Sequence, residues 1–234
     1  MNEETAMQIV YRRWQNSVDY PSSTEEEYLL IRGALNDGIE AWGGRAKEES
    51  IKWKELFVNL SDAATGTKTT TANDTTYSMP TDFESISSWV KITDSSNQSI
   101  YYPYKKADDV MRALKENSSE RFFYITGNDG AGYTLNLNPA PANTGDTIGY
   151  SYYKKPTILD EETDTIEMAK PYFAIYFALS VLNEEERPDL AGTYATKAAS
   201  VMEQMVIDNE IPPFNTSYGL GDLDYNLTGS AFGR

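Results

Sequence analysis

Apolar residues near the start of the chain recur at the spacing of one face of an α-helix. The residues that keep the i, i+3, i+4, i+7 spacing are Met7, Val10, Tyr11, Trp14 and Val18. This periodicity predicts a first amphipathic helix. We expect the helix to end before Pro21, because proline disfavours the helical conformation in the residue that precedes it.

A second apolar stripe follows and predicts a long helix from Thr24 to Trp42. Its members are Tyr28, Ile31, Leu35, Ile39 and Trp42. Gly43 and Gly44 should end this helix, because glycine is the commonest residue just beyond a helix C-terminus. A helix of about 28 Å, at 1.5 Å per residue, with one apolar face needs a partner helix to cover that face.

The middle of the chain, residues 53–156, changes to the alternation of apolar and polar residues that is typical of half-buried β-strands. The predicted strands are 56–60, 89–92, 99–104, 122–125, 133–137 and 148–152. Turn-forming residues at 94–97 and 127–130 separate neighbouring strands, which predicts antiparallel hairpins. A short helix is expected at 108–114.

The chain then returns to helices. The first, Pro171–Leu182, is expected to bury a face made of Phe173, Tyr176, Phe177, Ser180 and Val181. The second, Pro188–Asn209, is expected to bury Leu190, Tyr194, Lys197, Ala198, Val201 and Met205. After Pro212 and Pro213 the residues are mostly Gly, Asn, Ser and Asp with spaced apolar side chains, too few to form a core of their own.

This order of elements predicts an α+β fold. Residues 1–52 and 157–210 would supply the N- and C-terminal helices of one bundle, and residues 53–156 an antiparallel β-domain inserted between them. Residues 211–234 would form an extended C-terminal arm. The four tryptophans, Trp14, Trp42, Trp53 and Trp89, lie on apolar faces or strand edges, where core packing is the expected role for most.

The residue types present restrict the chemistry that the chain can perform. The sequence has no Cys and no His, which excludes disulfides, Cys or His metal sites and His-based catalysis. The segment Gly66-Thr-Lys68-Thr69 is similar to the end of a phosphate-binding loop, but the first glycine of that motif is missing. The acidic run Asp160–Asp164 is better explained as the cap of a helix near Ile166 than as a calcium site. We therefore expect no catalytic residue, cofactor or metal.

Charge and hydropathy limit the partners. The formal net charge is −16, which repels phosphates, so we expect no specific binding of DNA. An acidic channel would let DNA slide through without sticking, but on charge alone solubility is the favoured explanation. The 17 Tyr residues suit half-buried strands and protein interfaces equally. The N-terminus has no apolar stretch of a signal peptide, and the apolar run at 172–182 is too short for a bilayer. We expect synthesis in the cytoplasm and no membrane partner.

The order of several segments resembles that of phage adaptor proteins, the head–tail connector or tail-tubular subunits of short-tailed phages. The segments are Arg12-Arg13-Trp14, Trp53–Phe57, Tyr77–Phe83, Tyr124–Gly127, Leu135–Pro139 and Tyr152–Pro156. The resemblance covers nearly the whole chain. It implies a structural, non-enzymatic virion protein made in the host bacterial cytoplasm. Its copies would form a ring, commonly of twelve subunits, between the portal and the tail.

In such proteins the C-terminal arm often reaches along a portal subunit. The resemblance therefore implies a portal-binding role for the apolar residues of the arm, which are Phe214, Tyr218, Leu220, Tyr225, Leu227 and Phe232. The inserted β-domain would meet tail proteins. Two alternatives remain at this point: another neck or tail subunit, which only its binding partner would distinguish, and a carbohydrate-binding or carbohydrate-cleaving module, suggested by the Tyr, Trp and carboxylate content.

Overall fold

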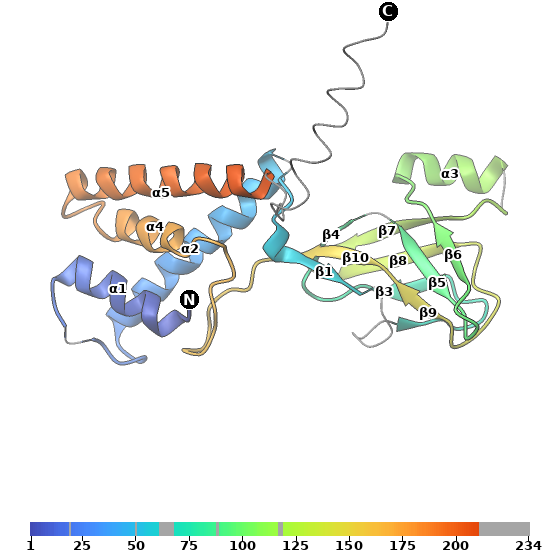
Figure 1. The fold of residues 1–234 in the computed structure, drawn as a ribbon, viewed down its shortest axis with the longest axis horizontal. Helices are drawn as coiled ribbons and strands as arrows, with labels where there is room; N and C mark the ends of the chain where they lie inside the picture. Colours follow the sequence, from blue (N-terminus) through green and yellow to red (C-terminus); the bar gives the residue numbers. More distant parts are fainter. Residues whose placement is uncertain (19, 50, 61–67, 88, 117–118, 211–234) are drawn as a thin grey trace, which may run out of the picture. The chain divides into compact units, whose positions relative to one another are not determined.

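The computed structural model describes residues 1–18, 20–49, 51–60, 68–87, 89–116 and 119–210 (Figure 1). These residues form five α-helices and ten β-strands, and the paired strands are antiparallel. The predicted α+β class is therefore confirmed. The chain divides into two compact units, a helical unit of Met1–Ile51 with Ile158–Arg234 and a β unit of Lys52–Thr157.

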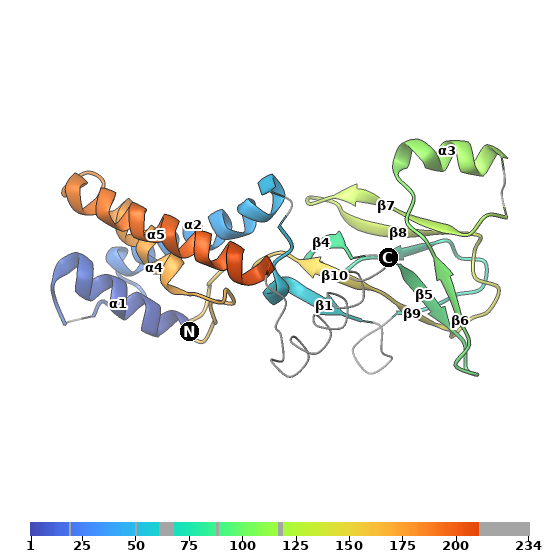
Figure 2. The same ribbon diagram turned by 45° about the horizontal axis from the view of Figure 1, so that its top comes forward.

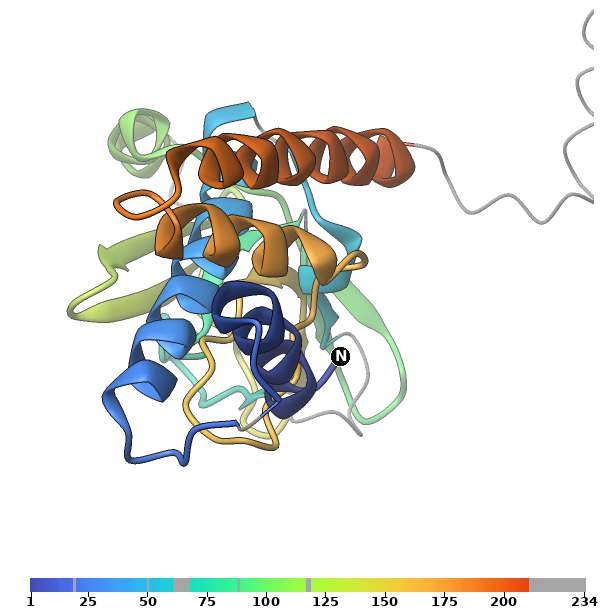
Figure 3. The same ribbon diagram turned by 90° about the vertical axis from the view of Figure 1, so that its left-hand side faces the viewer.

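Four helices form the helical unit: α1 (Glu3–Gln15), α2 (Glu26–Glu49), α4 (Tyr172–Leu182) and α5 (Pro188–Glu210). Helix α4 is central, because it contacts each of the other three, and Figure 3 shows it between α1 and α5. Its buried residues are Phe173, Ala174, Ile175, Ala178 and Leu179. A helix that is apolar on most sides suits this central position.

Helix α1 begins and ends with recognisable capping residues. The Asn2 side chain accepts a hydrogen bond from the Thr5 backbone N–H at 3.3 Å, which satisfies one of the free donors of the first turn. Asn16, in the left-handed conformation with φ of 53°, ends the helix. Val18 lies beyond this cap and is 76% exposed, so its predicted place on the buried face was wrong.

Helix α2 buries all five residues of its predicted stripe. Its predicted end was wrong, because the helix continues through Gly43 and Gly44 to Glu49. A glycine inside a helix costs only about 1 kcal/mol relative to alanine, less than the burial of the adjoining Trp42 contributes. Gly38 allows a close approach to α4: a Cβ at this position would lie 3.1 Å from the Ala174 Cα atom.

The faces predicted for the two C-terminal helices needed correction, although both helices are present. In α4, Val181 is 40% exposed, because apart from Phe173 the buried residues, Ala174, Ile175, Ala178 and Leu179, lie outside the predicted face. In α5 the buried side chains are Ala198, Met202 and Met205, whereas Leu190 is 42% exposed. The face predicted for α5 began in the first turn of the helix, but its buried side chains begin only at Ala198, near the middle of the helix.

The β unit contains three small sheets with the strand orders β1-β10-β4, β2-β9-β5-β6 and β3-β8-β7. The strands are β1 (Phe57–Asn59), β2 (Lys68–Thr69), β3 (Thr76–Ser78), β4 (Phe83–Ile86), β5 (Val90–Thr93), β6 (Ser99–Tyr102), β7 (Phe122–Asn128), β8 (Gly132–Asn138), β9 (Thr147–Gly149) and β10 (Ser151–Lys154). Both predicted hairpins, β5–β6 and β7–β8, are confirmed. The predicted short helix is α3 (Ala107–Glu116).

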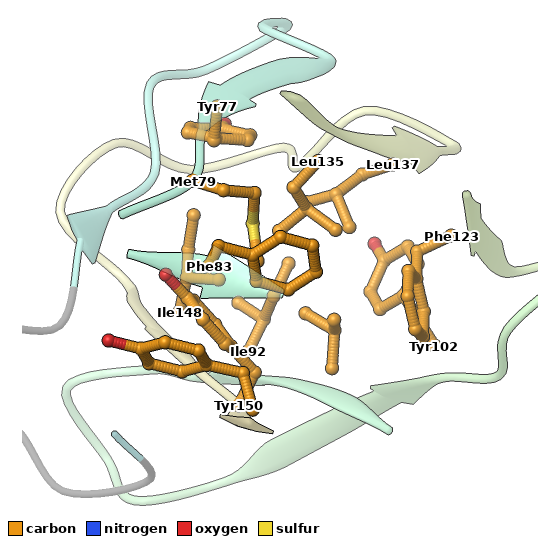
Figure 4. Close-up of a cluster of buried hydrophobic side chains, with 12 residues drawn as sticks. Tyr77, Met79, Phe83, Ile92, Tyr102, Phe123, Leu135, Leu137, Ile148 and Tyr150 are labelled. Carbon is orange, nitrogen blue, oxygen red and sulfur yellow. The ribbon is translucent and has the colours of Figure 1, made fainter. Parts of the chain in front are cut away.

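One core joins the three sheets (Figure 4). Tyr77 and Leu135 come from the sheet of β3 and β8, Ile92 and Ile148 from that of β5 and β9, and Phe83 from β4. Their side chains converge in the close-up view, and all are less than a tenth exposed. Because a small sheet needs a buried hydrophobic face to be stable, this shared core holds the unit together.

Candidate functional site

The described residues contain no cluster of side chains suited to a metal ion. Within these ranges no group of three or more acidic, His or Cys residues is placed to hold a metal ion. Lys68, from the segment that partly resembles a phosphate-binding loop, lies in β2, and its amino group donates to the Ser78 hydroxyl.

The acidic run at 160–164 folds into a turn. The Asp164 carboxylate accepts backbone N–H groups of Asp160 at 2.8 Å and Glu161 at 2.9 Å. These hydrogen bonds, first that from Glu161, lower the pKa of Asp164 below its usual value. The helix expected near Ile166 is absent from this described segment, because the backbone of Ile166 donates to Met1 instead. The run thus secures the N-terminus of the chain.

A buried ion pair fastens α1 to α2. Glu3 is completely buried, and its Oε1 atom lies 2.6 Å from Nε of Arg32. The same oxygen accepts the Tyr28 hydroxyl at 3.1 Å, and the Arg32 guanidinium stacks 5.0 Å from the Tyr28 ring centre. This pair was not predicted from the sequence, because helical periodicity marks apolar positions and gives no signal for a buried ion pair.

Tyrosine rings surround the ion pair. Tyr20 makes edge contacts with both Tyr11 and Tyr28. Burial raises the pKa of Tyr20 well above its usual value near 10, and the neighbouring Tyr28 raises it further. This phenol therefore stays neutral at physiological pH and contributes packing, not acid–base chemistry.

Cations and aromatic rings also connect α1, α4 and α5. The Arg13 guanidinium lies 5.7 Å from the Tyr176 ring centre, and the Lys197 amino group lies 5.3 Å from that of Tyr194. The rings of Tyr176 and Tyr194 are stacked, with their centres 6.2 Å apart. Arg13 thus takes part in the packing between helices.

Charge is divided very unequally between the two units. The helical unit contains 24 acidic and 9 basic residues, a formal net charge of −15. The β unit contains 12 acidic and 11 basic residues, a formal net charge of −1. Copies of the helical unit would repel one another if they were brought side by side, and the helical unit would also repel DNA. Copies of the β unit would not repel one another in this way.

Exposed apolar side chains are concentrated in one segment of the β unit. Among its described residues the exposed large hydrophobic side chains are Phe57, Trp89, Ile100, Tyr101, Tyr104, Met111 and Leu114. Six of the seven fall between residues 89 and 114, on or beside the β5–β6 hairpin and in the second half of α3. The core role expected for the tryptophans holds for Trp42 and Trp53, which are buried, and fails for Trp89, which is 56% exposed.

The six arm residues predicted to bind the portal lie outside the described residues. They are Phe214, Tyr218, Leu220, Tyr225, Leu227 and Phe232. Their role stays a prediction. Of the helices that the structure describes, none combines the length and the apolar character needed to cross a membrane.

Comparison with known proteins gives the family. No curated protein matches the sequence. The family model of the SU10 adaptor protein matches residues 5–216, a range that includes all ten described strands and, apart from the first two residues of α1, all five described helices. This family is structural and serves the assembly of phage heads and tails. The chain therefore belongs to the SU10 adaptor protein family and is a bacteriophage adaptor, a structural component of the virion that interacts with other head and tail proteins.

Proposed function

We propose that the adaptor assembles as a ring, of twelve subunits, that joins the portal to the tail and forms part of the conduit for DNA. The observation that carries this proposal is the family match over both units of the chain. A helical unit and a separate β unit also give each subunit two distinct kinds of surface, which suits a protein with more than one partner. No catalytic step is part of this function.

The charge of the helical unit supports the conduit. With a formal net charge of −15, its surface repels the phosphates of a passing duplex, so DNA slides without being held. The same charge opposes assembly, because neighbouring copies repel one another. We therefore propose that the free subunit is monomeric and that the portal acts as a template whose binding free energy offsets the repulsion.

The arm at residues 211–234 is proposed to contact the portal. Its apolar residues are separated by flexible backbone, which suits an extended segment laid across another protein. Each well-buried anchor contributes roughly 1.5–3 kcal/mol, while ordering costs about 1–2 kcal/mol per residue. Several anchors must therefore engage together for the arm to bind.

Truncation after Pro213 tests this role. We expect the shortened chain to melt at the same temperature as the full chain but to lose most of its binding in a pull-down with purified portal. Equal portal binding by both chains would refute the role of the arm. A lower melting temperature would show instead that the arm stabilises the subunit's own fold. Capture of a tail protein but not of the portal would favour the alternative of another neck or tail subunit.

A further inference from the structure

Basic residues of the helical unit gather, without acidic neighbours in the sequence, on α1, α4 and α5. The segments without an acidic residue are 5–15 of α1, 172–182 of α4 and 190–202 of α5. Their charged residues are Arg12, Arg13 and Lys197, and all three are exposed. Helix α4 contacts both α1 and α5, and α5 runs along α4 in Figures 1 and 2. A unit with a formal net charge of −15 therefore has one part of its surface that is locally positive.

A row of tyrosine rings holds two of these cations in place. The Arg13 guanidinium lies 5.9 Å from the ring centre of Tyr172 and 5.7 Å from that of Tyr176. The Lys197 amino group lies 5.7 Å from the ring centre of Tyr176 and 5.3 Å from that of Tyr194. We call these five residues the cation–tyrosine face. It offers positive charge and aromatic surface, both of which are common at protein interfaces.

The exposed side of α2 has the opposite charge. One line of exposed residues along this helix consists of Glu26, Leu29, Leu30, Gly33, Asp37 and Glu40. We call these six residues the acidic face. Leu29 and Leu30 are 54% and 50% exposed. The one basic residue between positions 26 and 40 is Arg32, which is paired with Glu3. The acidic face thus combines negative charge with apolar side chains.

The two faces lie on opposite sides of the α2–α4 pair. Helices α2 and α4 meet where a Cβ at Gly38 would lie 3.1 Å from the Ala174 Cα atom. Successive residues of a helix are turned by about 100°, so residues two positions apart point in nearly opposite directions. Tyr176 is two positions from Ala174, and Glu40 is two positions from Gly38. The cation–tyrosine face and the acidic face therefore point away from each other.

We propose that the cation–tyrosine face of one adaptor copy binds the acidic face of the next copy. The inference rests on the proposed ring and names the two surfaces that meet in it. Ring closure brings strongly acidic helical units together, so a stable contact needs unlike charges against each other. At physiological salt, exposed charges more than about 8 Å apart are largely screened, whereas unlike charges within the contact continue to attract one another. Portal binding offsets the repulsion that remains.

A second copy is the occupant because one helical unit carries both members of the complementary pair. In a closed ring every contact is head-to-tail, so each subunit uses two different surfaces. Two complementary faces that point away from each other meet this requirement. The tyrosine rings and the exposed Leu29 and Leu30 supply apolar area. Gly33, where a Cβ would meet no atom within 4 Å, leaves room for a side chain of the neighbour to approach α2.

The test counts adaptor copies on purified portal by native mass spectrometry, with too little adaptor to fill every portal. Contacts between neighbours make binding cooperative, so the wild type should give portals that are either full or empty. The variant Asp37→Arg/Glu40→Arg should lose this cooperativity and need at least about a tenfold higher concentration to fill a portal.

This variant separates the local contact from the net charge. It raises the formal net charge of the helical unit from −15 to −11, so general repulsion alone predicts easier assembly, whereas loss of the contact predicts weaker assembly. The control Glu184→Arg/Glu185→Arg makes the same change of net charge at two exposed residues outside both faces. The control should fill portals at least as well as the wild type.

A reciprocal variant completes the test. Arg13→Glu/Lys197→Glu makes the cation–tyrosine face acidic, and alone it should also fail to fill portals cooperatively. An equal mixture of this variant with Asp37→Arg/Glu40→Arg should recover full portals. Every junction of an alternating ring then pairs unlike charges, and a ring of twelve closes with such alternation. Circular dichroism melting of each variant checks that it is folded.

The possible failures are distinguishable. A wild type that does not bind the portal at all would refute the proposed function and, with it, the inference. Three results would overturn the inference alone: wild-type copies that bind the portal independently, a variant with Asp37 and Glu40 replaced that fills portals like the wild type, or a mixture of folded variants that does not recover. Weaker binding of the first copy to an empty portal would assign the altered face to the portal and would also overturn the inference.

Discussion

The ion pair between Glu3 and Arg32 allows a direct test of what holds α1 on α2. The two charged atoms are 2.6 Å apart, with exposed side-chain fractions of 0% for Glu3 and 18% for Arg32. At an effective dielectric constant of about 20, this separation corresponds to roughly 6 kcal/mol of attraction. Desolvation of both ions offsets much of it.

Replacement of Arg32 by Met keeps the apolar stem and removes the charge. It leaves the Glu3 carboxylate buried with a hydrogen bond from the Tyr28 hydroxyl. Removing one member of a buried pair costs about 3–5 kcal/mol, and the partial exposure of Arg32 reduces this to about 2–4 kcal/mol. The double variant Glu3→Gln/Arg32→Met should recover most of the loss, because no charge is then left buried without a partner.

Urea unfolding followed by circular dichroism at 222 nm measures these effects, since most helical residues belong to the helical unit. Lys170→Met is the matched control: it removes an ion pair to Asp208 with a 2.7 Å separation and with exposed side-chain fractions of 33% and 50%. Solvent screening should limit its effect to about 1 kcal/mol or less. A loss below 1 kcal/mol for Arg32→Met, or a double variant less stable than Arg32→Met, would refute the reasoning.

Three further outcomes follow from the structure. Gly38→Ala places a methyl group 3.1 Å from the Ala174 Cα atom and should destabilise the helical unit by about 1–3 kcal/mol in urea unfolding, whereas Gly33→Ala, with no atom within 4 Å, should be neutral or stabilising. Burial raises the pKa of Tyr150 to about 12, so the stability that its neutral phenol contributes is fully present below pH 10 and is lost as the pH rises toward 12. The wild type should therefore lose about 1–2 kcal/mol more of its free energy of unfolding between pH 10 and pH 12 than the Tyr150→Phe variant. Equal losses in the two proteins would contradict this. In a gel shift at physiological salt, duplex DNA should remain unbound at submicromolar protein.

The sequence predicted the elements well where one physical preference dominated. The stripe from Tyr28 to Trp42 has a single apolar side, and all of it is buried. The hairpin turn at 94–97 was predictable from composition because Asp94 accepts the backbone N–H groups of Ser96 and Gln98. In these segments local preference and tertiary packing agree.

Prediction failed where packing overrode local preference. Gly43 and Gly44 are poor helix residues, but tertiary contacts carry α2 through them. The prediction gave α4 one buried face, but a helix that contacts three others is buried on several sides. The Glu3–Arg32 pair joins residues 29 positions apart in sequence, and the exposed aromatic surface at Trp89 and Tyr101 depends on which strand lies at the sheet edge. Neither feature has a periodic signature.

Imaging of the adaptor bound to the portal tests whether the adaptor forms the proposed ring. Purified adaptor is mixed with purified portal, and the product is imaged by cryo-electron microscopy. The account predicts a closed ring of adaptor subunits on the axis of the portal, with acidic side chains of the helical unit facing the channel. Adaptor that does not bind the portal, or that binds as separate copies without closing a ring, would contradict it.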